Sequence, residues 1–385
     1  MEGQTGRKDA GARDAEGPMD VCVFGLRGFP LVEGGVERHC ESLYPRMDEG
    51  LAFTVFRRRP YVRSHRGYPH IRFVDLPSTR FKGVEAVLHS FLATREVARA
   101  RPAVAHIHNI GPALFSPMLK RQGIPIVLTY HSPNYEHGKW GRFARKLLRL
   151  SERIALANAS RIIFVNRFQM EKFPEEIRRK SVYIPNGIEP PAAPSGRNEL
   201  DALGVEPGRY VLAVGRITPE KGFDTLIRGF RASKHGGCKL VIAGGVETEG
   251  GYMEKLRRLA GGGGDVAFAG QVFGDKLAQL YANAALYVLS SNNEGFPLVL
   301  LEAMSYGLPV LASDIPASHL VSLDADDYFP RGNAKALAGK ISERLANPKK
   351  PAYDLAGHDW KTIAARTTAV YREAVEAKGN GENPA

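Results

Sequence analysis

The sequence predicts an α/β protein made of two doubly wound domains, each a parallel sheet between layers of helices. The length of 385 residues exceeds one ordinary core and favours two domains of roughly 150 to 200 residues. Short apolar runs alternate with segments of helical period in both halves, which is typical of a parallel sheet covered on both faces. A stretch rich in proline and glycine separates the two series. We therefore expect a cleft between the domains.

The first domain is expected over residues 19–186, after a polar, glycine-rich segment at 1–18 that predicts a disordered tail. Its apolar runs are short enough for buried strands, and its longer periodic segments fit helices. In chain order, the expected elements are strand 21–25, helix 36–47, strands 52–56 and 71–76, helix 84–100, and strands 104–108 and 126–130.

Residues 187–204 contain Pro190, Pro191 and Pro194 and are expected to form the interdomain linker. The alternation restarts in the second domain, residues 205–360, and a helix at 361–377 is expected to return to the first domain. The expected elements are strand 210–214, a helix from Phe223, strand 239–243, a helix from Tyr252, strand 266–269, a helix from Asp275, strand 285–289, a helix from Pro297 and strand 309–312.

Composition narrows the class of protein. Apolar residues make up 43% and charged residues 24%, which fits a globular chain, and no apolar run approaches the ~20 residues that span a bilayer. Cys22, Cys40 and Cys238 lack metal-ligand spacing and suit a reducing cytoplasm.

The charge is unevenly distributed between the two halves. Residues 19–185 carry 28 basic and 14 acidic side chains, whereas residues 205–330 carry 11 basic and 14 acidic side chains. The N-terminal half is therefore expected to meet an anionic partner.

The loop and helix at 290–313 are the most informative segment, because ligands of open α/β sheets bind beyond the carboxyl ends of the strands. Pro297 suits the first turn of a helix, so the amides of Leu298 and Val299 are expected to be unpaired and available to phosphate. Glu294 precedes the helix and Glu302 lies on it, so the two carboxylates should contact different parts of a ligand, a sugar hydroxyl and a ribose diol.

A second interpretation of this segment is purely structural. Glu294 would cap the helix, and Glu302 would be a solvated surface residue. The apolar surroundings of Glu302 in LVLLEAM argue against it, because an unpaired buried carboxylate is costly.

The turn GRITPEKGFD, residues 215–224, carries two cations that can reach one diphosphate without a metal. These are Arg216 and Lys221, and the alternative is a surface salt bridge. No cluster of acidic metal ligands accompanies them, so we expect no metal.

The first domain offers three further loops at strand ends. Gly34 and Gly35 permit close approach of a ligand to a helix N-terminus, although such a pair also marks simple turns. His131 is expected to hydrogen-bond the donor sugar or the reacting centre. The residues expected on the acceptor side are His108, Asn109 and Tyr135, and the alternative for His108 is a structural role, which is the commoner one for an isolated histidine.

With these residues in place, GRITPEKGFD and EGFPLVLLEAMSYGLPVLAS resemble glycosyltransferase family 4, whose members have the GT-B fold and a Glu-x7-Glu motif. The segments GLRGFP, GGVERH, HIHNIGPAL and KWGRFARKLLRLSER are similar to a bacterial subgroup that acts in exopolysaccharide, capsule and lipopolysaccharide biosynthesis. The resemblance runs from Met19 onward.

The resemblance implies transfer of a hexose-type sugar from a nucleotide-sugar donor to a glycan or lipid-linked glycan hydroxyl, with retention, without a metal and without a cofactor beyond the donor. It implies catalytic roles for Glu294, His131, Arg216 and Lys221. Donor contacts are implied for Gly34, Gly35, Arg216, Lys221, Gln271, Val272, Glu294, Phe296, Leu298, Val299 and Glu302. Asn292 and Asn293 depart from many members and leave the donor sugar open.

The segment from Lys139 to Arg153 predicts an amphipathic basic helix, which either docks on the core or also contacts an anionic membrane. With the regional charge, it favours a cytoplasmic protein held peripherally on the inner face of the cytoplasmic membrane. Two other readings remain: a nucleotide-sugar epimerase or phosphorylase of the same architecture, and a non-catalytic scaffold. Nucleic-acid binding is disfavoured because basic strands interleaved with aromatic residues are missing.

Overall fold

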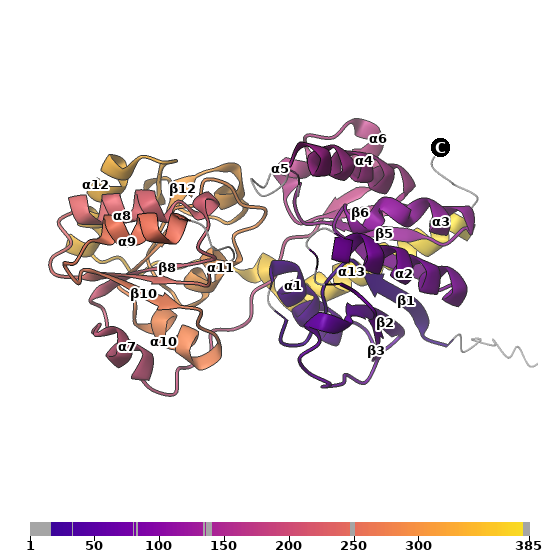
Figure 1. Cartoon of the computed structure of the whole chain (residues 1–385), viewed down its shortest axis with the longest axis horizontal. Helices are drawn as coiled ribbons and strands as arrows, with labels where there is room; N and C mark the ends of the chain where they lie inside the picture. The colour runs from indigo at the N-terminus through magenta and orange to yellow at the C-terminus, as the bar shows by residue number, and fades with distance from the viewer. Residues whose placement is uncertain are drawn as a thin grey trace, which may run out of the picture.

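The computed structural model describes residues 17–32, 34–79, 81, 84–133, 135, 141–246 and 251–379. Most of the expected tail, and Lys139 at the start of the expected basic helix, lie outside these residues. The chain forms two α/β lobes side by side, one from each half of the sequence (Figure 1). The fold is therefore the predicted pair of Rossmann-like domains, each with a parallel sheet.

The N-terminal sheet has the strand order β3-β2-β1-β4-β5-β6-β7, and its described pairings are all parallel. Every residue of β4 and β5 is buried, as expected for apolar runs between two helical layers. The strands are β1 (Met19–Phe24), β2 (Leu51–Arg58), β3 (Ile71–Leu76), β4 (Val104–His108), β5 (Ile126–Tyr130), β6 (Arg161–Phe164) and β7 (Ser181–Tyr183).

The helices of this half cover both faces of the sheet. The expected helix 36–47 ends early at Leu43, and a 3-10 turn, η1 (Tyr44–Arg46), continues it because Pro45 cannot extend an α-helix. The helices are α1 (Gly35–Leu43), α2 (Val84–Ala100), α3 (Ser116–Arg121), α4 (Arg142–Asn158), α5 (Arg167–Met170) and α6 (Glu175–Arg179), with the 3-10 turn η3 (Pro112–Phe115) before α3.

The C-terminal sheet has the order β10-β9-β8-β11-β12-β13, which is the 3-2-1-4-5-6 order of a Rossmann domain. The order reverses between β8 and β11, so the loops after these strands flank the expected ligand crevice. The strands are β8 (Tyr210–Val214), β9 (Lys239–Ala243), β10 (Val266–Gly270), β11 (Leu286–Leu289), β12 (Val310–Asp314) and β13 (Tyr328–Pro330).

Helices of the C-terminal half begin before residue 205. Helix α7 lies within the stretch expected to be a linker, and its Leu200 is fully buried in the C-terminal core. The helices are α7 (Asn198–Leu203), α8 (Phe223–Ala232), α9 (Tyr252–Ala260), α10 (Gly274–Asn283), α11 (Leu298–Ser305) and α12 (Ala334–Ala346), and the 3-10 turn η6 (Pro316–Leu320) follows β12.

The last helix, α13 (Trp360–Gly379), leaves the C-terminal lobe and packs on the N-terminal sheet (Figure 1). Trp360, Ile363 and Tyr371 are buried in the same cluster as Val21 and Phe53. The start of α13 packs closely against the backbone at Gly187, because a Cβ there would come 2.5 Å from the Trp360 ring. In the part of the chain that is described, no helix combines the length and the apolar character needed to cross a bilayer.

Candidate active site

The loop after β11 presents Glu294 at the centre of a polar cluster. Glu294 Oε1 lies 2.5 Å from Lys221 Nζ and accepts a hydrogen bond from Ser291 Oγ at 2.6 Å. The side chains of Lys221 and Glu294 are 16% and 11% exposed, so this ion pair is largely shielded from water. Two residues predicted from separate motifs therefore meet at one point of the C-terminal domain.

The two loops are joined by one backbone hydrogen bond and one side-chain hydrogen bond. The Asn292 amide donates to the Glu220 carbonyl at 2.7 Å, and Ser290 Oγ donates to the Lys221 carbonyl at 2.8 Å. Gly222 has a φ of +63°, and a Cβ there would collide with the Ser290 carbonyl. Arg216, at the other end of the turn, is exposed.

Glu302 is buried and bonded on both carboxylate oxygens. Oε2 accepts a hydrogen bond from Tyr281 at 2.8 Å, and Oε1 is paired with Arg38 of α1 in the other domain. The carboxylate raises the pKa of Arg38 further. Pro297 is the N-cap of α11, with no side-chain cap, so the interpretation of Glu294 as a cap and Glu302 as a surface residue is wrong.

The amide of Leu298 differs from the expectation. It donates to the Phe296 carbonyl at 3.0 Å, so it is not an unpaired helix-terminal donor in this structure. The turn formed by Phe296 and Pro297 provides that acceptor.

Three other residues expected to contact the donor, Val272, Phe296 and Val299, are partly buried against the C-terminal core. A Cβ on Gly245 would lie 3.2 Å from the Gln271 side chain. The loops after β9 and β10 are therefore in contact.

On the N-terminal side, Gly34 is the N-cap of α1 and has a φ of +139°, a conformation that favours glycine. A Cβ on Gly35 would meet nothing within 4 Å, so the start of α1 is open at this position. The carboxylate of Glu37 turns back and accepts from the Arg27 amide at 2.9 Å. Burial raises the pKa of Glu37.

His131 follows β5 and is partly exposed, whereas His108 ends β4 and is fully buried. The two rings are joined by a contact of 3.0 Å between His108 Nδ1 and His131 Nε2. His108 therefore lies behind His131 and can shape an acceptor site only through its neighbours. Burial, reinforced by nearby histidines, holds the pKa of both groups well below the ordinary imidazole value.

The other two residues expected on the acceptor side flank this pair. Asn109 has a φ of +71°. Tyr135 donates to Glu152 of α4 at 3.2 Å, and the Arg149 guanidinium lies 5.3 Å from the centre of its ring.

His39, His108 and His131 each bring a ring nitrogen within 4.8 Å of the other two. Ligands of a tetrahedral zinc ion at 2.0 to 2.1 Å would be about 3.3 Å apart. His39 Nδ1 is 2.7 Å from Asn186 Oδ1, and the facing nitrogens of His108 and His131 are already in hydrogen-bond contact. We interpret the group as a hydrogen-bonded network.

The two domains touch beside these loops. A Cβ on Gly295 would come 2.9 Å from the His131 carbonyl oxygen, so the loop that carries Glu294 lies directly against His131. Asn166, which caps α5, donates from Nδ2 to the Gly295 carbonyl at 2.8 Å. The sequence does not predict β6 and so gives no role to Asn166, although its position after the apolar run IIFV is a signal for a residue at a strand end.

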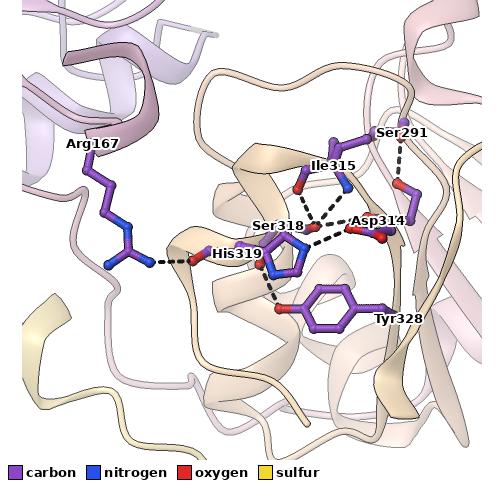
Figure 2. A network of polar contacts seen from close by, with 8 residues as sticks. Arg167, Ser291, Asp314, Ile315, Ser318, His319 and Tyr328 are labelled. Carbon is purple, nitrogen blue, oxygen red and sulfur yellow. Dashed lines mark hydrogen bonds and ion pairs between the residues drawn. The ribbon is translucent and has the colours of Figure 1, made fainter. Parts of the chain in front are cut away.

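A second contact between the domains joins Arg167 to the His319 carbonyl at 3.3 Å (Figure 2). Here Ser318 Oγ lies 2.7 Å from the Ile315 carbonyl and 2.9 Å from the Ser313 carbonyl. Ser313 Oγ in turn donates to the Ser291 carbonyl at 2.5 Å. This network supports the Glu294 loop from behind.

The two Rossmann-like domains, whose strand-end loops meet at Gly295 and His131, have the GT-B fold of glycosyltransferases. The C-terminal half, residues 198–353, matches the model for glycosyl transferases group 1. Residues 33–190 match the model for glycosyltransferase family 4.

The chain is 30% identical over 304 residues to a phosphatidyl-myo-inositol mannosyltransferase of Mycobacterium leprae, covering 72% of this chain and 75% of that protein. Two further relatives are matched over about half of their own length. They are an uncharacterized glycosyltransferase of Methanocaldococcus jannaschii, at 32% identity over 44% of this chain and 46% of that protein, and the amylovoran biosynthesis glycosyltransferase AmsD of Erwinia amylovora, at 25% over 44% and 48%.

Among solved structures, sucrose-phosphate synthase of Thermosynechococcus elongatus has a TM-score of 0.77 at 21% identity, covering 94% of this chain and all of that one. Anabaena HepE in complex with UDP-glucose has a TM-score of 0.69 at 16% identity, covering 94% and 99%. These likenesses show the fold. The chain belongs to glycosyltransferase family 4.

Proposed function

We propose that this glycosyltransferase moves a hexose-type sugar from a nucleotide-sugar donor to a hydroxyl of a lipid-linked glycan, with retention of configuration and without a metal. The observation that carries the proposal is the apposition of Gly295 and His131, which sets the loop that carries Glu294, the partner of Lys221, against the backbone of the N-terminal histidine. A donor bound there would have a cation for its leaving diphosphate and a carboxylate for its sugar.

The chemistry follows from fixed charges. A departing diphosphate gains negative charge in the transition state, and a preorganised cation in a shielded site stabilises that charge without reorganising water. Lys221 is held by Glu294 and by its own turn, and Arg216 on the same turn is close enough in sequence to act on the same group. Glu302 is assigned to the ribose, and His131 to a hydroxyl of the transferred sugar.

The acceptor is assigned from the surface of the N-terminal domain. Helix α4 exposes five cations: Arg142, Arg145, Lys146, Arg149 and Arg153. Helix α2, which like α4 packs on η3 and α3, exposes apolar side chains, namely Val84 at 58%, Val87 at 42%, Leu88 at 38% and Phe91 at 38%. Exposed cations and exposed apolar groups on two helices that pack on the same segment suit the interface of an anionic membrane, and they support attachment to its cytoplasmic face beside a lipid-linked glycan. The likeness to AmsD supports a role in cell-surface polysaccharide biosynthesis.

The reaction is tested by incubating the protein with a panel of nucleotide sugars, with and without lipid-linked acceptors, in the presence and absence of EDTA. We expect one donor to be consumed, EDTA to have no effect, and the anomeric proton of the product to show retained configuration by NMR. An inverted product would overturn the stereochemical assignment, and a new nucleotide sugar formed without acceptor would indicate an epimerase.

Membrane attachment is tested by sedimentation with vesicles of phosphatidylcholine and phosphatidylglycerol. Reversing Arg145, Lys146 and Arg149 to Glu should weaken binding at least about 100-fold, at about 1 kcal/mol for each cation. The matched control reverses Lys335, Lys349 and Lys350, exposed lysines of the C-terminal domain, which changes the net charge equally. Equal loss in both triple variants would show a nonspecific charge effect, contrary to the proposal.

A further inference from the structure

Two residues at the ends of neighbouring strands contact the same glycine of the other domain. Strands β5 and β6 are paired in parallel and end side by side at Tyr130 and Phe164. His131 and Asn166 therefore extend from the same edge of the N-terminal sheet. Gly295 meets both of them, because Asn166 Nδ2 donates to its carbonyl at 2.8 Å and a Cβ on it would come 2.9 Å from the His131 carbonyl oxygen.

The orientation of the Asn166 side-chain amide is determined by its two partners. Both partners are backbone groups, and a backbone N–H can only donate while a carbonyl oxygen can only accept. Oδ1 must therefore face the Gln169 amide, at 3.2 Å, and Nδ2 must face the Gly295 carbonyl. The residue is 3% exposed, so water has little access to either hydrogen bond. One side chain thus caps α5 in its own domain and binds a loop of the other domain.

The carbonyl that Asn166 binds belongs to the residue directly after Glu294. Within the C-terminal domain, the Glu294 carboxylate is already held by Lys221 and Ser291. Those two contacts place it relative to the C-terminal sheet and leave its position relative to β5 open. The close approach of Gly295 to the backbone after β5 is steric and sets only a minimum distance. The hydrogen bond from Asn166 adds a direction and a maximum distance.

We propose that Asn166 is a positioning residue of the transfer reaction, which holds the Glu294 loop at a fixed distance and direction from the end of β5. The hydrogen bond itself does not depend on the reaction, whereas its effect on transfer rests on the proposed role of Glu294. Donor binding by the C-terminal domain should change little without this bond. Transfer requires groups of both domains, so it should slow when the loop is displaced, because small misplacements of reacting groups are costly.

The contact is first tested in solution, on the full chain labelled with ¹⁵N-asparagine, with the Asn166 side-chain signals assigned by their loss in Asn166→Ser. We expect its amide protons to exchange with water at least about tenfold more slowly than those of Asn333, which caps α12 in the same way but is exposed. Gly295→Ala should shift the Asn166 signals, and Gly339→Ala should not. Equal exchange at the two asparagines, or signals unaffected by Gly295→Ala, would overturn the inference whatever the protein does with a sugar.

Two variants remove the hydrogen bond and keep the cap of α5. In Asn166→Ser, the hydroxyl can still accept from the Gln169 amide but is too short to reach Gly295, so kcat should fall roughly two- to tenfold, the size of one neutral hydrogen bond. In Asn166→Asp at pH 8, an ionised carboxylate faces the Gly295 carbonyl, and kcat should fall roughly 10- to 100-fold. The donor Kd, measured by calorimetry, should change less than about threefold in both. Asn333→Ser and Asn333→Asp are the controls and should leave kcat and Kd unchanged.

The kinetic outcomes separate this inference from the assignment of the site. Unchanged kcat in both Asn166 variants, together with a loss in Lys221→Ala, would overturn the positioning role and leave the site intact. A rise in the donor Kd that accounts for the whole loss would also overturn it, because Asn166 would then act in donor binding. Unchanged kcat in the Asn166 variants and in Lys221→Ala alike would contradict the site itself, and the positioning role with it.

Discussion

Arg38 and Glu302, 264 positions apart in the sequence, form an ion pair between α1 of one domain and α11 of the other. Glu302 is buried and also bound to Tyr281, whereas the Arg38 side chain is 55% exposed. The carboxylate assigned to the ribose is therefore held in place from both sides before any donor arrives. A ribose diol would have to share this carboxylate with Arg38.

The unequal exposure of the pair predicts unequal effects on donor affinity. Glu302→Gln should weaken donor binding by roughly 10- to 100-fold, because hydrogen bonds to a charged group contribute about 1.5 to 3 kcal/mol. Arg38→Gln should change it less than about fivefold, because exposed ion pairs contribute about 1 kcal/mol or less. Isothermal titration calorimetry with the donor measures both, and equal effects would contradict the assignment of Glu302.

The pair of Lys221 and Glu294 predicts losses in turnover. Lys221→Ala and Glu294→Gln should each lower kcat by roughly 100- to 1000-fold, the range seen when one preorganised transition-state contact is removed. Lys255→Ala is the control, because it breaks the 2.7 Å ion pair with Asp224 elsewhere in the same domain. Steady-state kinetics with the true donor measures the effect. Unchanged turnover in both site variants would show that the site is wrongly assigned.

The sequence predicted most of the strands from short, largely apolar runs. Strands β4 and β5 are five-residue runs buried throughout, and both were expected with these bounds. Strand β7 was missed because it has three residues and is only half-buried, and β6 was missed although its last three residues begin the apolar run IIFV. The candidate site residues could be predicted once the strands were placed, because residues that follow parallel strands gather at one edge of the sheet.

Contacts between distant segments could not be predicted in the same way. Lys221 and Glu294 were both named, but their pairing depends on two loops 73 positions apart in the sequence. Arg38 carries no local signal, because its partner lies in the other domain. His108 was placed by its strand end, whereas its burial depends on Tyr44 of η1 and on α13, which cover that end of the sheet.

The contact between Gly295 and His131 predicts a steric effect on catalysis. In Gly295→Ala, the new Cβ would come 2.9 Å from the His131 carbonyl oxygen and 3.2 Å from Ser132 Cβ, so the loop or the backbone after β5 must move. We expect kcat/KM to fall at least about tenfold, since small misplacements of reacting groups are costly. Gly339→Ala on α12, where a Cβ meets nothing within 4 Å, should keep full activity. Full activity in Gly295→Ala would mean that the domains do not approach in this way during turnover.

Buried histidines predict a loss of stability in mild acid. Burial lowers the pKa of His39 to about 4, and that of His89 and His106 to about 3, from an ordinary 6.5. The unfolded chain therefore takes up protons below pH 6.5 that the folded chain refuses. The free energy of unfolding should be highest above pH 6.5 and fall as the pH drops toward 4, by about 1.4 kcal/mol per pH unit for each histidine.

His89 allows this effect to be measured away from the site, because it is fully buried on α2. In His89→Leu, the fall in the free energy of unfolding between pH 6 and pH 4 should be shallower by about 1.4 kcal/mol per pH unit, since one proton-binding difference is gone. Urea unfolding at half-unit intervals of pH gives the slope, with replacement of the exposed His65 by Gln as the control. Burial, and after it the charge of Arg58, lowers the pKa of His89. An identical slope in His89→Leu and in the native protein would mean that His89 takes up its proton in the folded state as well, contrary to this prediction.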